Sequence, residues 1–377
     1  MYNCYKAFVK WFILFILVEL VSANHIFGIW VDQYIKKLDT KNVKRVKIIE
    51  YSFDNDNWKE RYVMTAEYND SGNLIKEARY TSDGILLFEY LHSYNEKGEI
   101  IKTIGRRMRK GKIIKYKYFY KYDQRGNQIE SIGYIENGQD DIETSKYTAR
   151  YDKNGNFIEG ISYQNGVALS KYVAEYDERN NMINESKYKV YIYKGVEHYQ
   201  LEYKNIYSYD NNNNLSTEKS YGNDGLFKYY YYYQYDDNNN LIRGISYAED
   251  GSILSQYFAK YDINNNLVKS INYGREGEIT SIHKAKYDEN NKLIEEWDCT
   301  NNVPKLIYSA QYDKHGNLLE DAHYDRRVKG GIGLDYKYSY RYDSRNNCIE
   351  EIYYVFFNEE NRWRPISRKA IEISYQN

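Results

Sequence analysis

Two asparagine-rich loops carry residues that could bind a calcium ion. Segments 236–240 and 262–266 read Asp-Asp-Asn-Asn-Asn and Asp-Ile-Asn-Asn-Asn, which matches the D-x-N-x-N start of a calcium loop. Such a loop also needs Gly at its sixth position and Glu at its twelfth, and here Tyr247 and Tyr273 stand at the twelfth. Turn formation explains the same pattern, because an Asp side chain can accept hydrogen bonds from nearby backbone amides. We therefore predict no metal site and no cofactor.

Histidines and glycine-rich segments are the other candidates for chemistry. Nucleophilic catalysis needs a nucleophile beside a base, but none of the histidines recurs with a Ser or Cys partner, so only folding could assemble such a pair. Segment 329–333 is glycine-rich but lacks the Gly-Lys-Ser/Thr ending of a phosphate-binding loop, so we interpret it as a long hairpin tip. We predict that the chain is not an enzyme. The six histidines are His25, His92, His198, His283, His315 and His323.

A cluster of basic residues surrounds Gly111. We expect a solvated turn there, with contact to an anionic polymer as the alternative. Over the whole chain, 53 Lys and Arg residues balance 54 Asp and Glu residues, so no net field favours nucleic acid. The basic residues are Arg106, Arg107, Arg109, Lys110 and Lys112.

Tyrosine dominates the composition of the 377-residue chain. There are 48 Tyr but only 12 Phe, 5 Trp and 2 Pro. Tyr favours strands and has an amphipathic ring, and scarce Pro suits a backbone that uses most of its amides in ladders. The composition indicates half-buried sheet, and leaves open whether some Tyr rows are exposed and stack on sugars.

The N-terminus has the pattern of an export signal. Lys6 and Lys10 precede an apolar run over 11–21, which Glu19 interrupts, and Val21-Ser22-Ala23 provides a small-residue cleavage site. The run is shorter than the roughly 18 residues of a spanning helix. We predict a signal peptide over 1–23, cleaved after Ala23, and no transmembrane domain in the mature chain; an uncleaved anchor is the alternative.

An internal repeat with a period of mostly 25 or 26 residues decides the architecture. A tyrosine followed by Asp or Asn marks each copy, and the spacing stretches to 33 residues between Tyr176 and Tyr209. These eleven anchor tyrosines are Tyr68, Tyr94, Tyr122, Tyr151, Tyr176, Tyr209, Tyr235, Tyr261, Tyr287, Tyr312 and Tyr342.

The fourth residue after every anchor tyrosine is Gly or Asn. Only Gly, and after it Asn, readily adopts a positive φ, so this position predicts a turn that closes a β-hairpin. Apolar and polar residues alternate before and after the turn, as in Tyr257, Ala259 and Tyr261, which is the period of a strand. The turn positions are Gly72, Gly98, Gly126, Gly155, Asn180, Asn213, Asn239, Asn265, Asn291, Gly316 and Asn346.

Each repeat therefore provides two strands and two turns. We predict an all-β chain of tandem antiparallel hairpins, which form a long, twisted or spiralling meander sheet because strand twist accumulates. Residues 24–60 form an N-terminal cap with a leading strand over 43–51, and residues 61–377 form the array, with a closing strand over 370–375. An outer-membrane barrel is disfavoured because Lys269, Ser270 and Asn272 put polar residues on both faces.

The unit Tyr-Asp-x-x-Gly-Asn-x-Ile at 151–158 resembles the YD repeat of bacterial RHS and teneurin-like proteins. The resemblance covers roughly residues 60–350. It implies hairpins that spiral into a shell able to enclose a toxin. The chain differs in its longer period, in Asn where that family often has Arg, and in lacking an Asp-Pro-rich core motif and a toxin domain.

These observations predict an exported, non-catalytic scaffold that binds a protein or polysaccharide along its sheet, in the periplasm, at the cell surface or outside the cell. The alternative is an RHS-like shell or accessory protein of a toxin or contact-dependent system. Cys4 would leave with the signal. Cys299 and Cys348 should not form a disulfide, because about four strand spacings of roughly 4.8 Å separate their strands, whereas bridged Cα atoms lie within about 7 Å.

Overall fold

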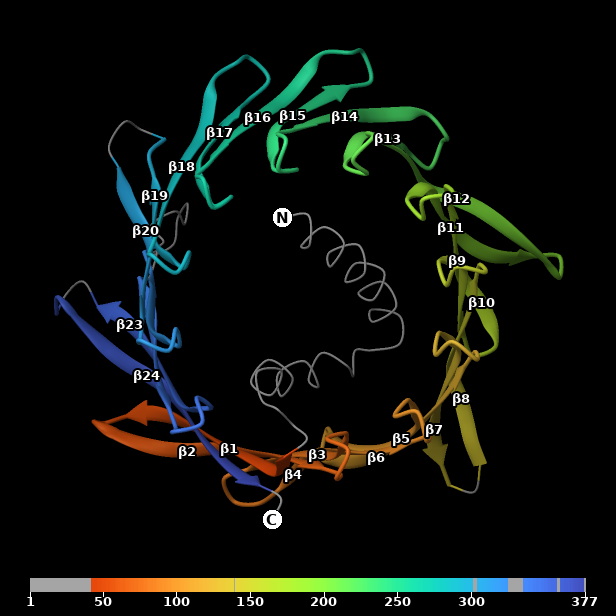
Figure 1. Ribbon diagram of the computed structural model, residues 1–377. Coiled ribbons are helices and arrows are strands. Elements are labelled where there is room, and N and C mark those ends of the chain that lie inside the picture. Colours follow the sequence, from red (N-terminus) through yellow and green to blue (C-terminus); the bar gives the residue numbers. More distant parts are fainter. Residues whose placement is uncertain (1–41, 139, 301–303, 325–334, 358–359, 376–377) are drawn as a thin grey trace.

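The structure is a closed antiparallel β-barrel in which every strand pairs with its neighbours in the sequence (Figure 1). The computed structural model describes residues 42–138, 140–300, 304–324, 335–357 and 360–375. The predicted signal peptide, residues 24–41 of the predicted cap, and the glycine-rich segment 329–333 lie outside the described residues. Nowhere in the described ranges is there a helix long and apolar enough to cross a bilayer.

The barrel consists of 24 strands, two from each hairpin. They are β1 (Val43–Asp54), β2 (Asn57–Tyr68), β3 (Leu74–Thr81), β4 (Leu86–Tyr94), β5 (Ile100–Arg109), β6 (Lys112–Tyr122), β7 (Gln128–Asn137), β8 (Asp140–Tyr151), β9 (Phe157–Gln164), β10 (Val167–Tyr176), β11 (Met182–Tyr193), β12 (Val196–Tyr209), β13 (Leu215–Tyr221), β14 (Phe227–Tyr235), β15 (Leu241–Ala248), β16 (Ile253–Tyr261), β17 (Leu267–Tyr273), β18 (Ile279–Tyr287), β19 (Leu293–Asp298), β20 (Lys305–Tyr312), β21 (Leu318–His323), β22 (Tyr336–Tyr342), β23 (Cys348–Phe357) and β24 (Arg362–Tyr375).

The prediction of tandem hairpins is confirmed, but the predicted open meander was wrong. β1 pairs with β24, with Val46 opposite Ile373 and Ile48 opposite Ile371. Both strands alternate apolar and polar residues in the same phase, so their pairing buries Ile48 together with Met64 in an apolar core cluster. A closed sheet has no edge strand, which removes the unpaired amides that an open array would expose at each end.

The same turn recurs after each anchor tyrosine. We call the five residues that follow the tyrosine the anchor turn. In the turn after Tyr261, Asp262 Oδ1 accepts hydrogen bonds from the amides of Asn264 (2.9 Å) and Asn266 (2.8 Å), and the amide of Asn265 donates to the Asp262 carbonyl (3.1 Å). Asn265 has a φ of +63°. All eleven Gly or Asn turn positions have φ between +61° and +84°.

The choice between Asn and Gly at the positive-φ position has a lateral consequence. Where it is Asn, its Oδ1 accepts a hydrogen bond from the last Asn of the preceding anchor turn. The Nδ2···Oδ1 distances are between 2.7 and 3.1 Å, and Gly cannot make this bond. The pairs are Asn156–Asn180, Asn181–Asn213, Asn214–Asn239, Asn240–Asn265, Asn266–Asn291 and Asn317–Asn346.

The anchor tyrosines connect each repeat to the one before it. The Tyr261 hydroxyl donates to the carbonyl of Leu241 (3.1 Å), and Tyr342 donates in the same way to Leu318 (2.9 Å). The same bond is present from Tyr94, Tyr122, Tyr151, Tyr209, Tyr235, Tyr287 and Tyr312. Burial raises the pKa of Tyr261 and of Tyr342 to about 12, which keeps these hydroxyls protonated as donors.

Two substitutions at Gly155 test the anchor turn. Gly155 has a φ of +84°, and a Cβ there would meet only Asn127 Nδ2, at 3.9 Å. Gly155→Val should lower the free energy of unfolding by about 1–3 kcal/mol, because a β-branched residue is strained at positive φ. Gly155→Asn should be near neutral, since its Oδ1 can accept from Asn127. Urea melts of both variants measure the difference, and equal stability of the two would contradict the turn assignment.

Acid should weaken the anchor turns. A backbone hydrogen bond from Asn266 lowers the pKa of Asp262, and a side-chain hydrogen bond from Asn317 lowers the pKa of Asp313. A carboxylate whose pKa is lowered in the folded state stabilises that state above its ordinary pKa, and the stabilisation disappears as the pH falls through the lowered value. We therefore expect the melting temperature to fall steeply below about pH 4.

Asp262→Asn provides the matched control for this acid effect. Asn69 and Asn95 occupy the same position naturally and accept the same amide bonds, so the variant keeps the turn and removes one titrating group. The difference in melting temperature between wild type and Asp262→Asn should shrink between pH 6 and pH 3. A difference that does not depend on pH would show that the carboxylate charge does not stabilise the turn.

Candidate interaction surface

The wall of the barrel has two chemically different faces. The tyrosine face carries the residues four and two positions before each anchor, such as Tyr172 and Ala174, together with the residues opposite them on neighbouring strands. The other, charged face carries cross-strand ion pairs, for example Glu159 with Arg150 (3.3 Å) and Lys171 (2.7 Å). Partly exposed pairs of this kind contribute little stability each.

The tyrosine face has a second periodic feature, nine residues after each anchor. At that position the side chain is either small or acidic. A small residue leaves room for a neighbouring ring, and an acidic one accepts hydrogen bonds from polar side chains beside it. This row consists of Glu77, Thr103, Ser131, Gly160, Glu185, Glu218, Gly244, Ser270, Glu296, Asp321 and Glu351.

Glu185 on β11 accepts three hydrogen bonds from the two neighbouring strands. The Tyr172 hydroxyl on β10 lies 2.5 Å from its Oε2, while Asn205 Nδ2 (2.8 Å) and the Tyr207 hydroxyl (2.6 Å) on β12 bind its Oε1. Burial, and then the Glu185 charge, raise the pKa of Tyr172, so its hydroxyl stays protonated as a donor. The network joins β10, β11 and β12 at the base of the longest hairpin.

Three histidines lie beside acidic residues of the same row. His92 Nε2 is 3.8 Å from Glu77 Oε1, His323 Nε2 is 3.0 Å from Asp321 Oδ2, and His283 Nδ1 is 4.0 Å from Glu296 Oε1. Sequence reasoning missed these pairs. The His92 and His283 pairs each join two strands, so their proximity depends on the register, whereas Asp321 and His323 lie two residues apart on one face of β21. The acidic or small row nine residues after the anchor was the signal that could have found them.

Folding does place one hydroxyl beside a histidine. Thr103 Oγ1 lies 2.9 Å from His92 Nδ1, so Thr103, His92 and Glu77 follow one another in the order nucleophile, base and acid. Thr103 is only 4% exposed, however, and a nucleophile must reach its substrate. The arrangement therefore fits an internal polar network better than a reaction centre.

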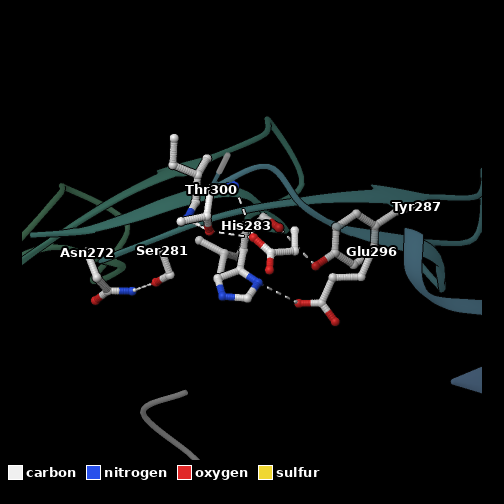
Figure 2. Close-up of polar contacts among 9 residues, drawn as sticks. Asn272, Ser281, His283, Tyr287, Glu296 and Thr300 are labelled. Carbon is white, nitrogen blue, oxygen red and sulfur yellow. Dashed lines mark hydrogen bonds and ion pairs between the residues drawn. The ribbon is translucent and has the colours of Figure 1, made fainter. Parts of the chain in front are cut away.

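Figure 2 shows the pair on β18 and β19. His283 points toward Glu296, while Ser281 on the same side of the sheet accepts a hydrogen bond from Asn272 Nδ2 (2.7 Å). The nearby Thr300 hydroxyl accepts from the amide of Ile282 (3.0 Å). The described residues contain no group of His, Cys, Asp or Glu side chains that could hold a metal ion.

The β11–β12 hairpin interrupts the repeat and exposes large apolar side chains. This hairpin lies in the 33-residue interval between two anchor tyrosines, and it extends outward from the ring (Figure 1). Its turn is formed by Lys194 and Gly195, which have φ of +51° and +78°. Tyr191 stacks on His198 with centroids 5.4 Å apart, and Tyr193 meets the same ring edge-on at 6.0 Å. We call this hairpin the finger; its exposed side chains include Tyr191, Ile192, Tyr193, Val196 and Tyr199.

The other residues that the sequence singled out lie apart from the finger tip. The anchor turns form one rim of the barrel and the finger turn belongs to the opposite rim. Arg109, Lys110 and Lys112 are exposed at the β5–β6 turn, and Arg106 pairs with Glu89 (2.9 Å). Cys299 is buried, Cys348 is half-buried, and no disulfide joins them.

Comparisons with known proteins give no family. No family model matches the chain, and no curated protein matches it. Among solved structures, the TcdB2–TccC3 crystal structure aligns at 9% identity and a TM-score of 0.27, covering 84% of this chain and 27% of that one. A porin-like protein from Bacteroides uniformis aligns at 11% identity and a TM-score of 0.24, covering 89% and 98%.

A protein of unknown function from Bacteroides fragilis aligns at 18% identity and a TM-score of 0.16, covering 41% of this chain and 86% of that one. The chain spans about a quarter of the length of the TcdB2–TccC3 chain. Because TM-scores this low do not establish a shared fold, any function has to be argued from the geometry of this chain.

Two glycines occupy the same repeat position, and replacing each with alanine should change the free energy of unfolding in opposite directions. A Cβ on Gly160 would contact the Tyr147 hydroxyl and lie 2.6 Å from Phe157 Cζ, whereas a Cβ on Gly244 would have ordinary contacts at 3.7 Å and beyond. Gly160→Ala should cost about 1–3 kcal/mol by overpacking. Gly244→Ala should be neutral or stabilise by up to about 1 kcal/mol, because alanine loses less backbone entropy. Chemical denaturation of both variants tests this, and equal losses would refute the crowding argument.

Proposed function

We propose that the protein is an exported, non-catalytic scaffold that binds a protein or polysaccharide partner, and that the finger makes the main contact. The observation that carries the proposal is the group of large exposed side chains on the hairpin that contains the longest repeat spacing. Tyr193 is 58% exposed and Val196 is 59% exposed. Clustered exposed aromatic and aliphatic residues are typical of interaction sites, and Tyr is enriched among residues that contribute most to binding.

The rest of the barrel supports this role by holding the finger in place. The finger strands pair with each other from Asn184–Ile206 to Tyr193–Val196, and Glu185 fixes their base to β10. A preformed binding element loses little conformational freedom when its partner binds, so more of its contact energy appears as affinity.

A shell or accessory role in a toxin system is a second candidate. Closure of the sheet between β1 and β24 supports it, because a closed wall separates an interior from an exterior. A shell would hold its cargo inside, whereas the scaffold proposed here binds through a hairpin that points away from the ring. Protection of a co-expressed cargo from protease would favour the shell.

The test compares two variants in a cell-binding assay. Fluorescently labelled wild-type protein is titrated onto a panel of bacterial and animal cells and onto a glycan array. Tyr191→Ser combined with Tyr193→Ser should weaken binding about 30-fold or more, the loss expected for a residue pair worth about 2 kcal/mol. Ile263→Ser, at a 95% exposed residue in an anchor turn, serves as the matched control and should bind as wild type does.

Pretreatment of the cells distinguishes the two kinds of partner. Loss of binding after protease treatment identifies a protein partner, and loss after periodate treatment identifies a polysaccharide. If the wild type binds nothing, or if the finger variant and the control bind equally, the proposed role of the finger is wrong.

A further inference from the structure

The tyrosine face contains a charge-free arc over β14–β18. At the face positions fixed by strand register, no Lys, Arg, Asp or Glu occurs between Glu218 on β13 and Glu296 on β19. Charged residues make up 28% of the chain, so an arc of five strands without any is unusual for it. On the opposite face the same strands carry cations at Arg243, Lys260 and Lys269.

Aromatic rings line one side of this arc. Tyr231 stacks on Tyr233 with centroids 6.3 Å apart and planes at 7°, and Tyr229 meets Tyr231 edge-on at 6.0 Å. Tyr229 is 42% exposed, and Tyr231 and Tyr257 are half-buried. The rings thus form a column along β14 with ring surface partly open to solvent.

Gly244 leaves space beside these rings that packing does not require. Its missing Cβ would lie 3.7 Å from Tyr257 Cβ and 3.8 Å from Tyr233 Cδ1, so an alanine would fit. Gly160, nine residues after its own anchor in the same way, is crowded by Tyr147 and Phe157. Glycine at position 244 is therefore not required to relieve a clash, although the position itself is buried.

Neutral hydroxyl and amide groups line the other side. Ser246 and Ser255 are joined through their hydroxyls (2.7 Å), and Asn272 donates to Ser281 (2.7 Å). Figure 2 shows Asn272, Ser281 and His283 on one side of the sheet. Ser246 is buried, whereas Ser255 is exposed and Asn272 and Ser281 are half-buried. A hydroxyl can donate once and accept twice, and an amide offers two donors and an acceptor, so the last three residues have hydrogen-bonding capacity left for a ligand.

We propose that this arc binds a neutral polysaccharide. Ring faces next to hydroxyls and amides match a ligand that has apolar C–H faces and hydroxyl edges. A polyanion or polycation would find no opposite charge on the arc, and desolvating its charges would be uncompensated. Five strands at about 4.8 Å span roughly 24 Å, which suits a chain of sugars rather than a single one. The residues involved are separate from the finger, so this proposal stands or fails independently of the function proposed above.

Adjacent residues on β16 provide the test. Ser255 lies on the tyrosine face and the next residue, Gln256, on the charged face, so Ser255→Lys and Gln256→Lys add the same charge to opposite sides of one strand. The full chain is titrated by calorimetry with neutral glucan, mannan, galactan and chitin oligosaccharides, and with hyaluronate and dextran sulfate as acidic probes. Thermal melts of both variants check folding.

At least one neutral oligosaccharide should bind, and Ser255→Lys should weaken that binding at least tenfold. Gln256→Lys, on the charged face of the same strand, should leave it unchanged. The proposal is overturned if no neutral probe binds, if only the acidic probes bind, or if Ser255→Lys binds like Gln256→Lys while both melt like wild type. Loss of neutral-glycan binding in Tyr193→Ser but not in Ser255→Lys would move the glycan site to the finger and also overturn it.

Discussion

Strand register in this barrel depends on a backbone constraint that recurs after each anchor tyrosine. A residue with positive φ, four places after the tyrosine, closes the turn, and an Asp or Asn side chain holds the amides of that turn. In an antiparallel sheet a one-residue slip would move every side chain to the other face. The anchor turns therefore decide which residues form the tyrosine face, and they are joined laterally by asparagine pairs and by tyrosine hydroxyls bonded to the preceding repeat.

Chemical differences between the two faces follow from that register. On the charged face, Lys, Arg and Glu pair across strands close to solvent, whereas the tyrosine face satisfies buried polar groups with short-range acceptors such as Glu185. Each residue nine positions after an anchor tyrosine is either acidic, and can accept a hydrogen bond, or small, and leaves room for a neighbouring ring. At Gly244 the row has neither a charge nor a crowded ring, so the face is neutral there and a Cβ would fit.

In both proposed surfaces, the side chains depart from the pattern by which each repeat packs against its neighbours. In the finger, extra residues lengthen one hairpin beyond what pairing with adjacent strands requires, so Tyr191 and Tyr193 have no sheet to pack against. In the arc, the repeat pattern continues, but its face positions carry no Lys, Arg, Asp or Glu. A rigid closed wall suits both, because the strands that present these side chains are held on each side by a neighbour.

The sequence by itself determined the hairpins, the anchor turns and the all-β class, because turn chemistry and alternation act over a few residues. It also predicted a leading strand over 43–51 and a closing strand over 370–375, although these are longer in the structure. Only the tertiary structure decided that β1 and β24 pair, since that contact joins residues about 325 positions apart and depends on accumulated twist. It also decided that His92 meets Thr103 and Glu77, and that Glu185 meets Tyr172 and Tyr207. Those contacts depend on the register between strands, which cannot be predicted from a local sequence pattern.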